Sequence, residues 1–203
     1  IGIVASRLIE SYYRPTLGFT KSGEKLAASA RSVKGFDVYE ALEQCSEHLE
    51  QFGGHKYAAG LTLSPDQYFP FKEKFEAVVK KTIDKELLIP EITIDSPLEL
   101  SDITPKFFRI LKQMGPFGPK NMKPVFTTNA VRDNGYGKRV GADKSHLKLN
   151  IINGADQKTY NAIGFGLGDK ITSTQNDFDI VYNLDENEWN GNTSIQLLLK
   201  DIK

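Results

Sequence analysis

The residues with the clearest capacity for chemistry lie in the segment 51–61, Gln-Phe-Gly-Gly-His-Lys-Tyr-Ala-Ala-Gly-Leu. Its paired glycines, Gly53 and Gly54, allow positive φ angles and a close approach of a ligand to the backbone. The N–H groups of such a turn can bind an anion, and His55 beside them can donate a hydrogen bond or a proton. The segment therefore predicts an anion-binding turn. The alternative is a tight turn whose histidine is satisfied within the fold.

A second candidate for anion binding precedes this turn. Arg31 and Ser32 lie at the end of a predicted strand, with Lys34 and Gly35 just beyond. Arginine can bind a phosphate through two parallel hydrogen bonds, and serine and backbone donors can add to them. We expect Arg31 and Ser32 to bind phosphate, the alternative being a solvated surface arginine.

Positive charge is concentrated in one segment of a chain whose formal net charge is zero. Residues 106–148 hold 10 Lys and Arg but only two acids, whereas residues 169–203 hold seven acids and three bases. Cations interleaved with aromatic rings are what single-strand binding requires. We therefore predict nucleic-acid contacts from Lys120, Lys123, Arg132, Lys138, Arg139, Lys144 and Lys148, with Phe117, Tyr136 and Trp189 as nearby rings. For Phe117, which a proline and a glycine flank, filling the base of a barrel is the favoured interpretation.

The sequence lacks the residue pattern of a metal or nucleophile centre. A hydrolytic metal site needs clustered His, Asp or Glu, yet His48, His55 and His146 are not paired at ligand spacing. No D-x-D or D-H-H motif, Walker loop, G-x-S-x-G elbow or zinc signature occurs. We therefore expect no metal site and no complete catalytic centre within these 203 residues.

The composition is that of an ordinary globular protein, 39% apolar and 26% charged, with room for one large domain or two smaller ones. No apolar run approaches the roughly 18 residues of a membrane span, so no membrane association is expected. The one cysteine, Cys45, excludes an internal disulfide and favours a cytoplasmic, reducing compartment. The chain opens at Ile1 within a helical pattern, which leads us to expect a part of a longer protein.

The first half of the chain predicts a small α/β domain over residues 14–90, after the end of a linking helix at 1–13. The helix at 1–13 is expected to bury Ile1, Val4, Leu8 and Tyr12 on one face. Asp37 and Glu40 fit a capping box for a helix whose apolar stripe reaches residue 52. Cys45 and His48 are expected to pack within or beside that stripe. Strands are expected at 16–20, 25–30 and 60–63, and a last helix at 68–86.

The second half, residues 91–203, predicts an all-β domain that resembles an OB-fold barrel. An extended segment at 92–100 and a helix capped by Thr104 and Pro105 come first. The helix is expected to bury Phe107, Phe108, Leu111 and Met114. Five strands follow at 125–133, 146–152, 159–165, 178–184 and 194–202, with a helical turn near 167–172. Asn190-Gly191 is a strong hairpin signal, and five short strands in about 80 residues favour a small closed barrel.

Several motifs occur here in the order in which one protein family has them. Residues 53–60 match the G-G-H-x-x-A-A-G signature of the DHHA1 domain, and residues 30–37 resemble the A-R-S and G-F-D segment upstream of it. Residues 1–8 resemble the start of a linking helix, residues 116–126 the loop P-F-G-x-G-N-x-x-P-x-F, and residues 187–197 the last hairpin. Over essentially its whole length the chain resembles the C-terminal part of the RecJ family, in the DHH phosphoesterase superfamily. Lys120 and Met122 depart from the loop pattern, where glycine and proline are usual.

The resemblance implies a 5′→3′ exonuclease that acts on single-stranded DNA in recombination and repair. It implies Mn²⁺ or Mg²⁺ held by a DHH domain that these residues do not include. It further implies that Arg31, Ser32 and the segment 53–55 hold the scissile or a neighbouring phosphate, and that His55 neutralises charge on the phosphoryl oxygens. The barrel would guide one strand. Single-stranded DNA is the expected partner, with other recombination and repair proteins as further partners.

Two other functions fit the same residues. One is a non-catalytic, OB-type module that binds single strands, with the α/β domain as a scaffold. The other is a DHH-type phosphodiesterase for short oligonucleotides or cyclic dinucleotides, a family that usually lacks a barrel such as 124–203. RNA in place of DNA also stays open, because no motif here reads a 2′-hydroxyl.

Overall fold

The computed structural model describes residues 1–153 and 156–203, without the side chains of residues 153, 156, 157 and 189. The chain divides into two compact units, Ile1–Glu91 and Ile92–Lys203. We call them unit 1 and unit 2 and describe each by itself. Within the described residues no helix is long and apolar enough to cross a membrane.

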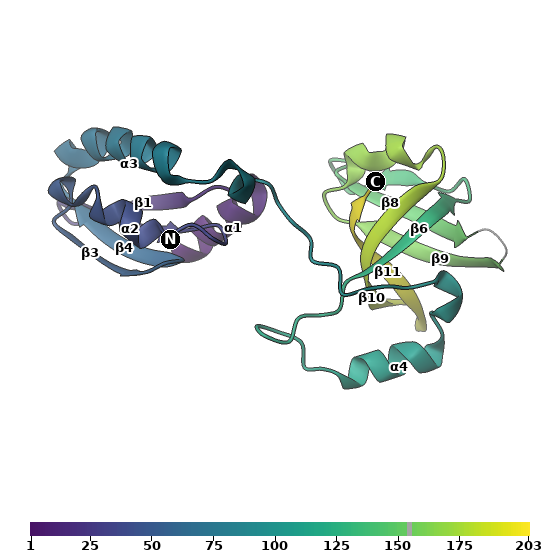
Figure 1. The fold of residues 1–203 in the computed structure, drawn as a ribbon. Helices are drawn as coiled ribbons and strands as arrows, with labels where there is room; N and C mark the ends of the chain where they lie inside the picture. The colour runs from purple at the N-terminus through teal and green to yellow at the C-terminus, as the bar shows by residue number, and fades with distance from the viewer. Residues whose placement is uncertain (154–155) are drawn as a thin grey trace. The chain divides into compact units, whose positions relative to one another are not determined.

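Unit 1 is a four-stranded antiparallel sheet with the order β1-β2-β4-β3, flanked by helices (Figure 1). The hairpin predicted at 16–30 is confirmed, because β1 pairs with β2 around a turn at Gly23, where φ is +60°. The buried side chains of the sheet face α2 and α3, and Phe71, Leu42 and Leu63 are almost fully enclosed there. The elements are α1 (Gly2–Tyr12), β1 (Thr16–Ser22), β2 (Lys25–Arg31), α2 (Val38–Glu43), β3 (Gln51–His55), β4 (Ala58–Leu63) and α3 (Tyr68–Thr82).

The buried face of α1 differs from the one predicted. Ala5 is fully buried, whereas Val4 and Tyr12 are mostly exposed. The reason is close packing of small residues: a Cβ on Gly18 of β1 would lie 3.8 Å from the Cβ of Ala5. The helix therefore approaches the sheet through Ala5 and through Ile1, whose Cγ2 would lie 3.4 Å from the same Cβ, whereas Val4 and Tyr12 of the predicted stripe are exposed.

The helix after Asp37 is confirmed at its start and wrong at its end. The Asp37 carboxylate accepts hydrogen bonds from the backbone N–H groups of Tyr39 and Glu40, as the capping pattern predicts. The helix ends at Glu43 and a 3₁₀ turn (Ser46–His48) follows, in place of a stripe that continues to residue 52. Pairing of the following segment with β4 overrides the helical spacing of its apolar residues.

The glycine–histidine segment is also placed differently from the prediction. It forms the end of edge strand β3, in which Gly53 pairs with Gly60 and His55 with Ala58. The turn itself is Lys56-Tyr57. The anion-binding turn predicted at residues 53–55 is therefore wrong as local structure, and these residues present a sheet surface.

Unit 2 is a seven-stranded sheet with the order β5-β6-β10-β11-β9-β8-β7, in which β6 also pairs with β8 (Figure 1). All five predicted strands are present, and the hairpin at Asn190-Gly191 is confirmed by the pairing on either side of it. The elements are β5 (Ser96–Pro97), α4 (Pro105–Gln113), β6 (Phe126–Asp133), β7 (Lys138–Val140), β8 (His146–Asn153), β9 (Asp156–Gly164), the 3₁₀ helix η5 (Gly168–Thr174), β10 (Phe178–Trp189) and β11 (Asn192–Ile202).

Three features of unit 2 differ from expectation. The short strand β7 was not predicted. Most of the extended segment at 92–100 forms no strand, and Ile92 and Ile94 are exposed. Helix α4 begins as predicted, with the Thr104 hydroxyl accepting the N–H of Phe107, but Met114 is exposed because the chain leaves the helix there.

Candidate nucleic-acid interface

One row across the sheet of unit 1 brings together two of the predicted site residues. Arg31, at the end of β2, pairs with Ala58 at the start of β4, and Ala58 also pairs with His55 at the end of β3. Directly opposed residues of antiparallel strands project from the same face. Arg31 and His55 therefore lie on one face, two strands or roughly 10 Å apart. This face is the one that does not carry α2 and α3, since the alternate residues Ala59 and Leu61 are buried.

The next row on the same face carries almost no side chains. Gly53 pairs with Gly60, and Gly60 pairs with Ser29. A Cβ on Gly53 would meet no atom within 4 Å, and a Cβ on Gly60 would meet only the Ala28 carbonyl oxygen, at 3.9 Å. The fold itself therefore does not require glycine at either position. A strand glycine without a packing reason often marks a bulge, a bend or a place where a ligand or another backbone approaches closely.

Gly54 differs from its neighbour in this respect. Its φ is +146°, and a Cβ there would lie 2.4 Å from the Ala58 carbonyl oxygen. Glycine at position 54 is thus required by the strand pairing. Of the two predicted glycines, Gly54 shapes the strand end, and Gly53 leaves the surface bare.

The imidazole of His55 is exposed and held in one orientation. Its Nδ1 lies 3.0 Å from the Ala58 carbonyl oxygen. Because a carbonyl oxygen only accepts, Nδ1 carries the hydrogen, and Nε2 is the atom left for a ligand. Nε2 can donate to a phosphate oxygen once the ring is protonated, and the ring is then a cation.

Arg31 is half-buried where the start of α1 meets the sheet. One guanidinium nitrogen donates to the Ala30 carbonyl oxygen at 2.8 Å. A Cβ on Gly2 would lie 2.6 Å from another guanidinium nitrogen, so the absence of a side chain at Gly2 leaves room for it. Arg31 forms no ion pair with any residue that the structure describes, which leaves its charge available to an anion.

Ser32 has a bonding partner within the fold. Its hydroxyl donates to the Phe36 carbonyl oxygen at 2.9 Å, and its backbone N–H donates to the Tyr57 carbonyl oxygen. The hydroxyl proton is therefore engaged with Phe36, and it is the backbone N–H of Ser32 that anchors the β3–β4 turn. Ser29, which sequence reasoning missed, is the serine of the face that carries Arg31 and His55. The signal for it was the alternation of Ser29 and Arg31 with the buried Ala28 and Ala30.

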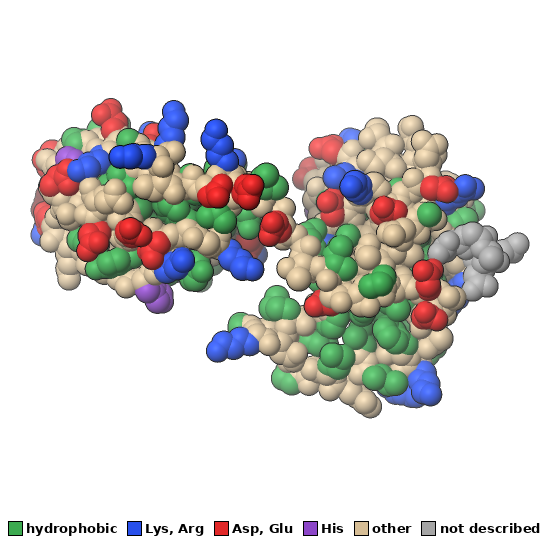
Figure 2. Space-filling model, viewed as in Figure 1, with side chains coloured by type: hydrophobic (Ala, Val, Ile, Leu, Met, Phe, Trp, Pro, Cys, Tyr) green, Lys and Arg blue, Asp and Glu red, His purple; other side chains and the backbone are tan. Residues whose placement is uncertain are grey.

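The cations predicted in unit 2 do not form one patch. Three of the seven form ion pairs with acids of the segment 169–203: Lys123 with Asp185, Arg132 with Asp177, and Arg139 with Asp169. On the face that Figure 2 displays, Lys and Arg lie among Asp and Glu. The net positive charge of segment 106–148 is therefore partly neutralised within the fold. Lys120 and Lys123 both lie in the loop between α4 and β6.

The hairpin formed by β7 and β8 keeps a free pair of cations. Lys138 of β7 lies directly opposite Lys148 of β8, and both side chains are exposed. Like charges directly opposite each other are unfavourable, so an anion bound between them would relieve repulsion. Neither lysine has an ion-pair partner among the described residues. Lys144, also exposed, lies in the turn that joins the two strands.

Asp133 holds the loop that leads into this hairpin. One carboxylate oxygen accepts the N–H groups of Gly135 and Gly137, and the other accepts the N–H of Asn150. A row of amides continues from Asn150, whose side chain contacts those of Asn134 and Asn161. This acid within a basic segment thus has a positioning role, and the amides add hydrogen-bonding groups to the outer face of β8 and β9.

The predicted aromatic rings have different outcomes. Phe117 is half-buried and lines a small pocket together with Leu111 and Leu184; that it fills the base of a barrel stays a prediction. Tyr136 is 74% exposed in the loop before β7. The side chain of Trp189 lies outside the described residues. Phe165, which directly follows β9 and is 64% exposed, was not singled out from the sequence.

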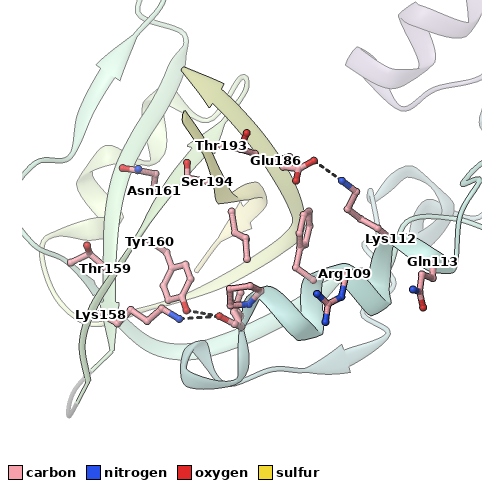
Figure 3. A pocket seen from close by; sticks show the side chains of 14 residues that line it. Arg109, Lys112, Gln113, Lys158, Thr159, Tyr160, Asn161, Glu186, Thr193 and Ser194 are labelled. Atoms are coloured by element: carbon pink, nitrogen blue, oxygen red, sulfur yellow. Dashed lines mark hydrogen bonds and ion pairs between the residues drawn. The ribbon is translucent and has the colours of Figure 1, made fainter. Parts of the chain in front are cut away.

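A pocket of about 840 Å³ in unit 2 lies beside α4 and not at the β7–β8 hairpin (Figure 3). Its lining includes Ile103, Phe108, Arg109 and the ring of Tyr160. Two of its cations are engaged: Lys112 pairs with Glu186, and Lys158 donates to the Ile103 carbonyl oxygen at 3.0 Å. The Tyr160 hydroxyl donates to the same oxygen. These bonds fix α4 against the strands, and the pocket adds no free charge beyond Arg109.

The described residues contain no group of three or more His, Cys, Asp or Glu that could hold a metal ion. The donor set therefore does not fit the divalent metal that the resemblance implies.

Both units match known protein families. Residues 94–201 match the RecJ OB domain, and residues 1–81 match the DHHA1 domain. The single-stranded-DNA-specific exonuclease RecJ of Bacillus subtilis is 34% identical over 206 residues, which cover 99% of this chain and 26% of that protein. The protein of the same name from Escherichia coli is 29% identical over 211 residues, which cover 100% of this chain and 36% of that protein.

The fold is also similar to solved structures. The crystal structure of RecJ in complex with Mg²⁺ from Thermus thermophilus matches with a TM-score of 0.78 and 27% identity, over 100% of this chain and 30% of that one. The corresponding complex with Mn²⁺ gives a TM-score of 0.77 and 26% identity. The chain spans 26% of the length of the first curated relative and 36% of the second.

Proposed function

Because the chain belongs to the RecJ family through its RecJ OB domain and DHHA1 domain, we propose that it is the strand-binding and phosphate-positioning part of a 5′→3′ single-stranded-DNA exonuclease. Hydrolysis of the phosphodiester bond then needs a DHH domain outside this chain, which would bind the Mn²⁺ or Mg²⁺. That domain would supply an activated water. The chain's own residues bind the strand and orient the phosphate.

The observation that carries the proposal is the bare glycine strip of unit 1 beside two groups that bind anions. The Gly53–Gly60 pair allows a DNA backbone to lie directly on the sheet. Arg31 at one side can bind a phosphate through parallel N–H groups. His55 at the other side can donate from Nε2 to a phosphoryl oxygen as negative charge builds up on it. A preorganised donor of this kind contributes to turnover as well as to binding.

Unit 2 would bind the strand that leads to this site. The pairing of β6 with both β10 and β8 supports a closed five-stranded barrel, the form in which OB domains bind oligonucleotides. Lys138, Lys144 and Lys148 would follow the phosphates, whereas the ion-paired Lys123, Arg132 and Arg139 would contribute less. Other recombination and repair proteins remain further proposed partners.

Binding and cleavage test the proposal separately. Residues 1–203 are titrated with a fluorescent oligothymidylate and with a duplex of equal length, at several salt concentrations. We expect a preference for the single strand, a negative slope of log affinity against log salt, and no hydrolysis in the presence of Mn²⁺. Equal affinity for duplex, or metal-dependent cleavage by the pure chain, would overturn the proposal.

A further inference from the structure

Phe165 is an aromatic ring that the fold leaves exposed at a defined place. It directly follows β9, in which Tyr160 and Ala162 are buried, so the alternation of the strand puts Phe165 with the outward residues. Its side chain is 64% exposed. A single exposed phenylalanine is common on protein surfaces, so its role depends on how it is held and what surrounds it.

His146 holds the Phe165 ring from one edge. The register pairs Leu147 of β8 with Gly164 of β9, which makes His146 and Phe165 the next residues on the two strands. Their rings are 5.1 Å apart between centroids at an interplanar angle of 81°. An edge-to-face contact of this kind fixes one side of the phenyl ring and leaves a face open.

The histidine is itself fixed by the turn after Phe165. The backbone N–H of Gly166 donates to His146 Nδ1 at 3.2 Å, and the Ser145 hydroxyl lies 3.0 Å from the same atom. Gly166 has a φ of +75°, and a Cβ there would meet no atom within 4 Å. The chain therefore turns away from the strand directly after Phe165, and the bond from Gly166 ties the turn to the imidazole. The imidazole, and with it the Phe165 ring that it contacts, is thus oriented before any ligand binds.

Free positive charge lies on the next outward row of the same face. Lys148 follows His146 by two residues along β8, a separation of roughly 7 Å, and Lys138 lies opposite it on β7. Both lysines lack an ion-pair partner among the described residues. An oriented ring beside a pair of unpaired cations matches a nucleotide, in which an aromatic base is joined to an anionic phosphate.

We propose that Phe165, oriented by His146, is a base-stacking platform for single-stranded DNA, with the adjacent phosphate held by Lys138 and Lys148. The assignment rests on the proposed function of unit 2 and names a contact within it. A single strand is the matching ligand because its bases are free to stack on a protein ring, whereas the bases of a duplex stack on one another. Stacking requires no base-specific hydrogen bond, which suits an exonuclease that must process any sequence.

The test compares Phe165→Ala with Phe165→Tyr and Phe69→Ala in residues 1–203. Phe69 is a matched control, since it is 69% exposed on α3 of unit 1 and also forms an edge contact, with Tyr68. With a fluorescent oligothymidylate, we expect Phe165→Ala to raise Kd roughly 10-fold, about 1.4 kcal/mol, with an unchanged salt slope. Phe165→Tyr should restore binding, and Phe69→Ala should leave Kd as in the parent chain.

A stacking-specific readout accompanies the affinities. An oligonucleotide that contains 2-aminopurine should lose fluorescence on binding to the parent chain and to Phe165→Tyr, and less so on binding to Phe165→Ala. If the parent chain binds the oligonucleotide and Phe165→Ala binds it equally well, the stacking proposal is overturned and the proposed function stands. If the parent chain does not bind the oligonucleotide, both are overturned.

Discussion

Arg31 and His55 occupy one cross-strand row of the first sheet, because Ala58 is the register partner of both. The two residues are 24 positions apart in the sequence, and only the pairing of β2, β4 and β3 aligns them. In this row Arg31 and the exposed imidazole of His55 lie on the two sides of Ala58, next to the bare Gly53–Gly60 pair, and Thr16 of β1 continues the row beyond Arg31. In this part of the sheet the fold requires Gly54, whereas Gly53 and His55 are residues that a bound ligand would contact. Substitutions can therefore test the two roles separately.

In the exonuclease that we propose to contain this chain, His55→Ala should lower turnover by roughly 10²-fold, because it removes a preorganised donor from the developing charge. The fold should be unaffected, since the imidazole is exposed and, among the described residues, hydrogen-bonds only the Ala58 carbonyl oxygen. Turnover is measured with excess 5′-labelled oligonucleotide, and folding by circular dichroism.

The matched control is His48→Ala, which removes an imidazole hydrogen-bonded to Gln67 outside the Arg31–His55 row. Turnover of this variant should stay near that of the parent enzyme. If His55→Ala also keeps full turnover, the chain acts as a binding module without a part in catalysis, and the phosphate-positioning role is excluded.

The two adjacent glycines should respond in opposite ways to alanine. Gly54→Ala should lower the free energy of unfolding by about 1–3 kcal/mol, because its φ of +146° and the nearby Ala58 oxygen leave no room for a Cβ. Gly53→Ala should leave stability unchanged or slightly higher, since open space surrounds that position. Thermal unfolding of residues 1–203 measures both effects.

Measurements of turnover test whether Gly53 is needed for ligand binding when stability is unaffected. In the proposed exonuclease, Gly53→Ala should weaken strand binding or turnover although the protein is as stable as the parent. A Gly53→Ala enzyme with normal kinetics would show that no ligand approaches this strip closely.

The ion pair between Arg139 and Asp169 should restrain DNA binding by unit 2. Asp169→Asn frees Arg139, which lies next to Lys138 on β7. We expect a higher affinity for single strands and a salt slope steeper by about 0.7, the value for one added phosphate contact. Glu47→Gln, which frees Lys74 of α3 in unit 1, is the control and should change neither quantity. An unchanged slope for Asp169→Asn would remove Arg139 from the proposed interface.

Local signals in the sequence predicted much of this fold. The Thr104 cap, the Asp37 cap and the Asn190-Gly191 hairpin all depend on a few neighbouring residues, and the structure contains each of them. The approximate positions of the five long strands of unit 2 were predicted as well, and the alternation of Leu147, Leu149 and Ile151 indicated one of them, β8. The family resemblance added the identity of both domains, which periodicity alone does not give.

The features that were missed depend on contacts between distant residues. The predicted helix after Asp37 is too long, because Gln51 and Phe52 pair with β4 although the spacing of Phe52 also fits the apolar stripe of a helix. The cationic segment looked free because its partners, Asp169, Asp177 and Asp185, come far later in the sequence than the cations that they neutralise. Phe165 was assigned to a strand, but its exposure follows from the turn at Gly166 and the position of His146.

Cys45 should make the stability of unit 1 depend on pH in the alkaline range. The side chain is fully buried, and this burial raises the pKa of the thiol from 9.0 to about 11. Below pH 9 the thiol is protonated in both the folded and the unfolded states, so it causes no pH dependence there. Between about pH 9 and 11 the thiol ionises only in the unfolded state, and the free energy of unfolding therefore falls as the pH rises.

Cys45→Ala isolates this contribution from that of the lysines and tyrosines. The variant should be less stable than the parent at neutral pH, because it leaves a small cavity in the core. Its free energy of unfolding should nevertheless fall less steeply between pH 9 and 11, so that the two curves converge. Urea unfolding of residues 1–203 at a series of pH values measures this difference. Parallel curves over that range would mean that the thiol ionises equally in both states, which contradicts its enclosure beneath the sheet that carries Arg31 and His55.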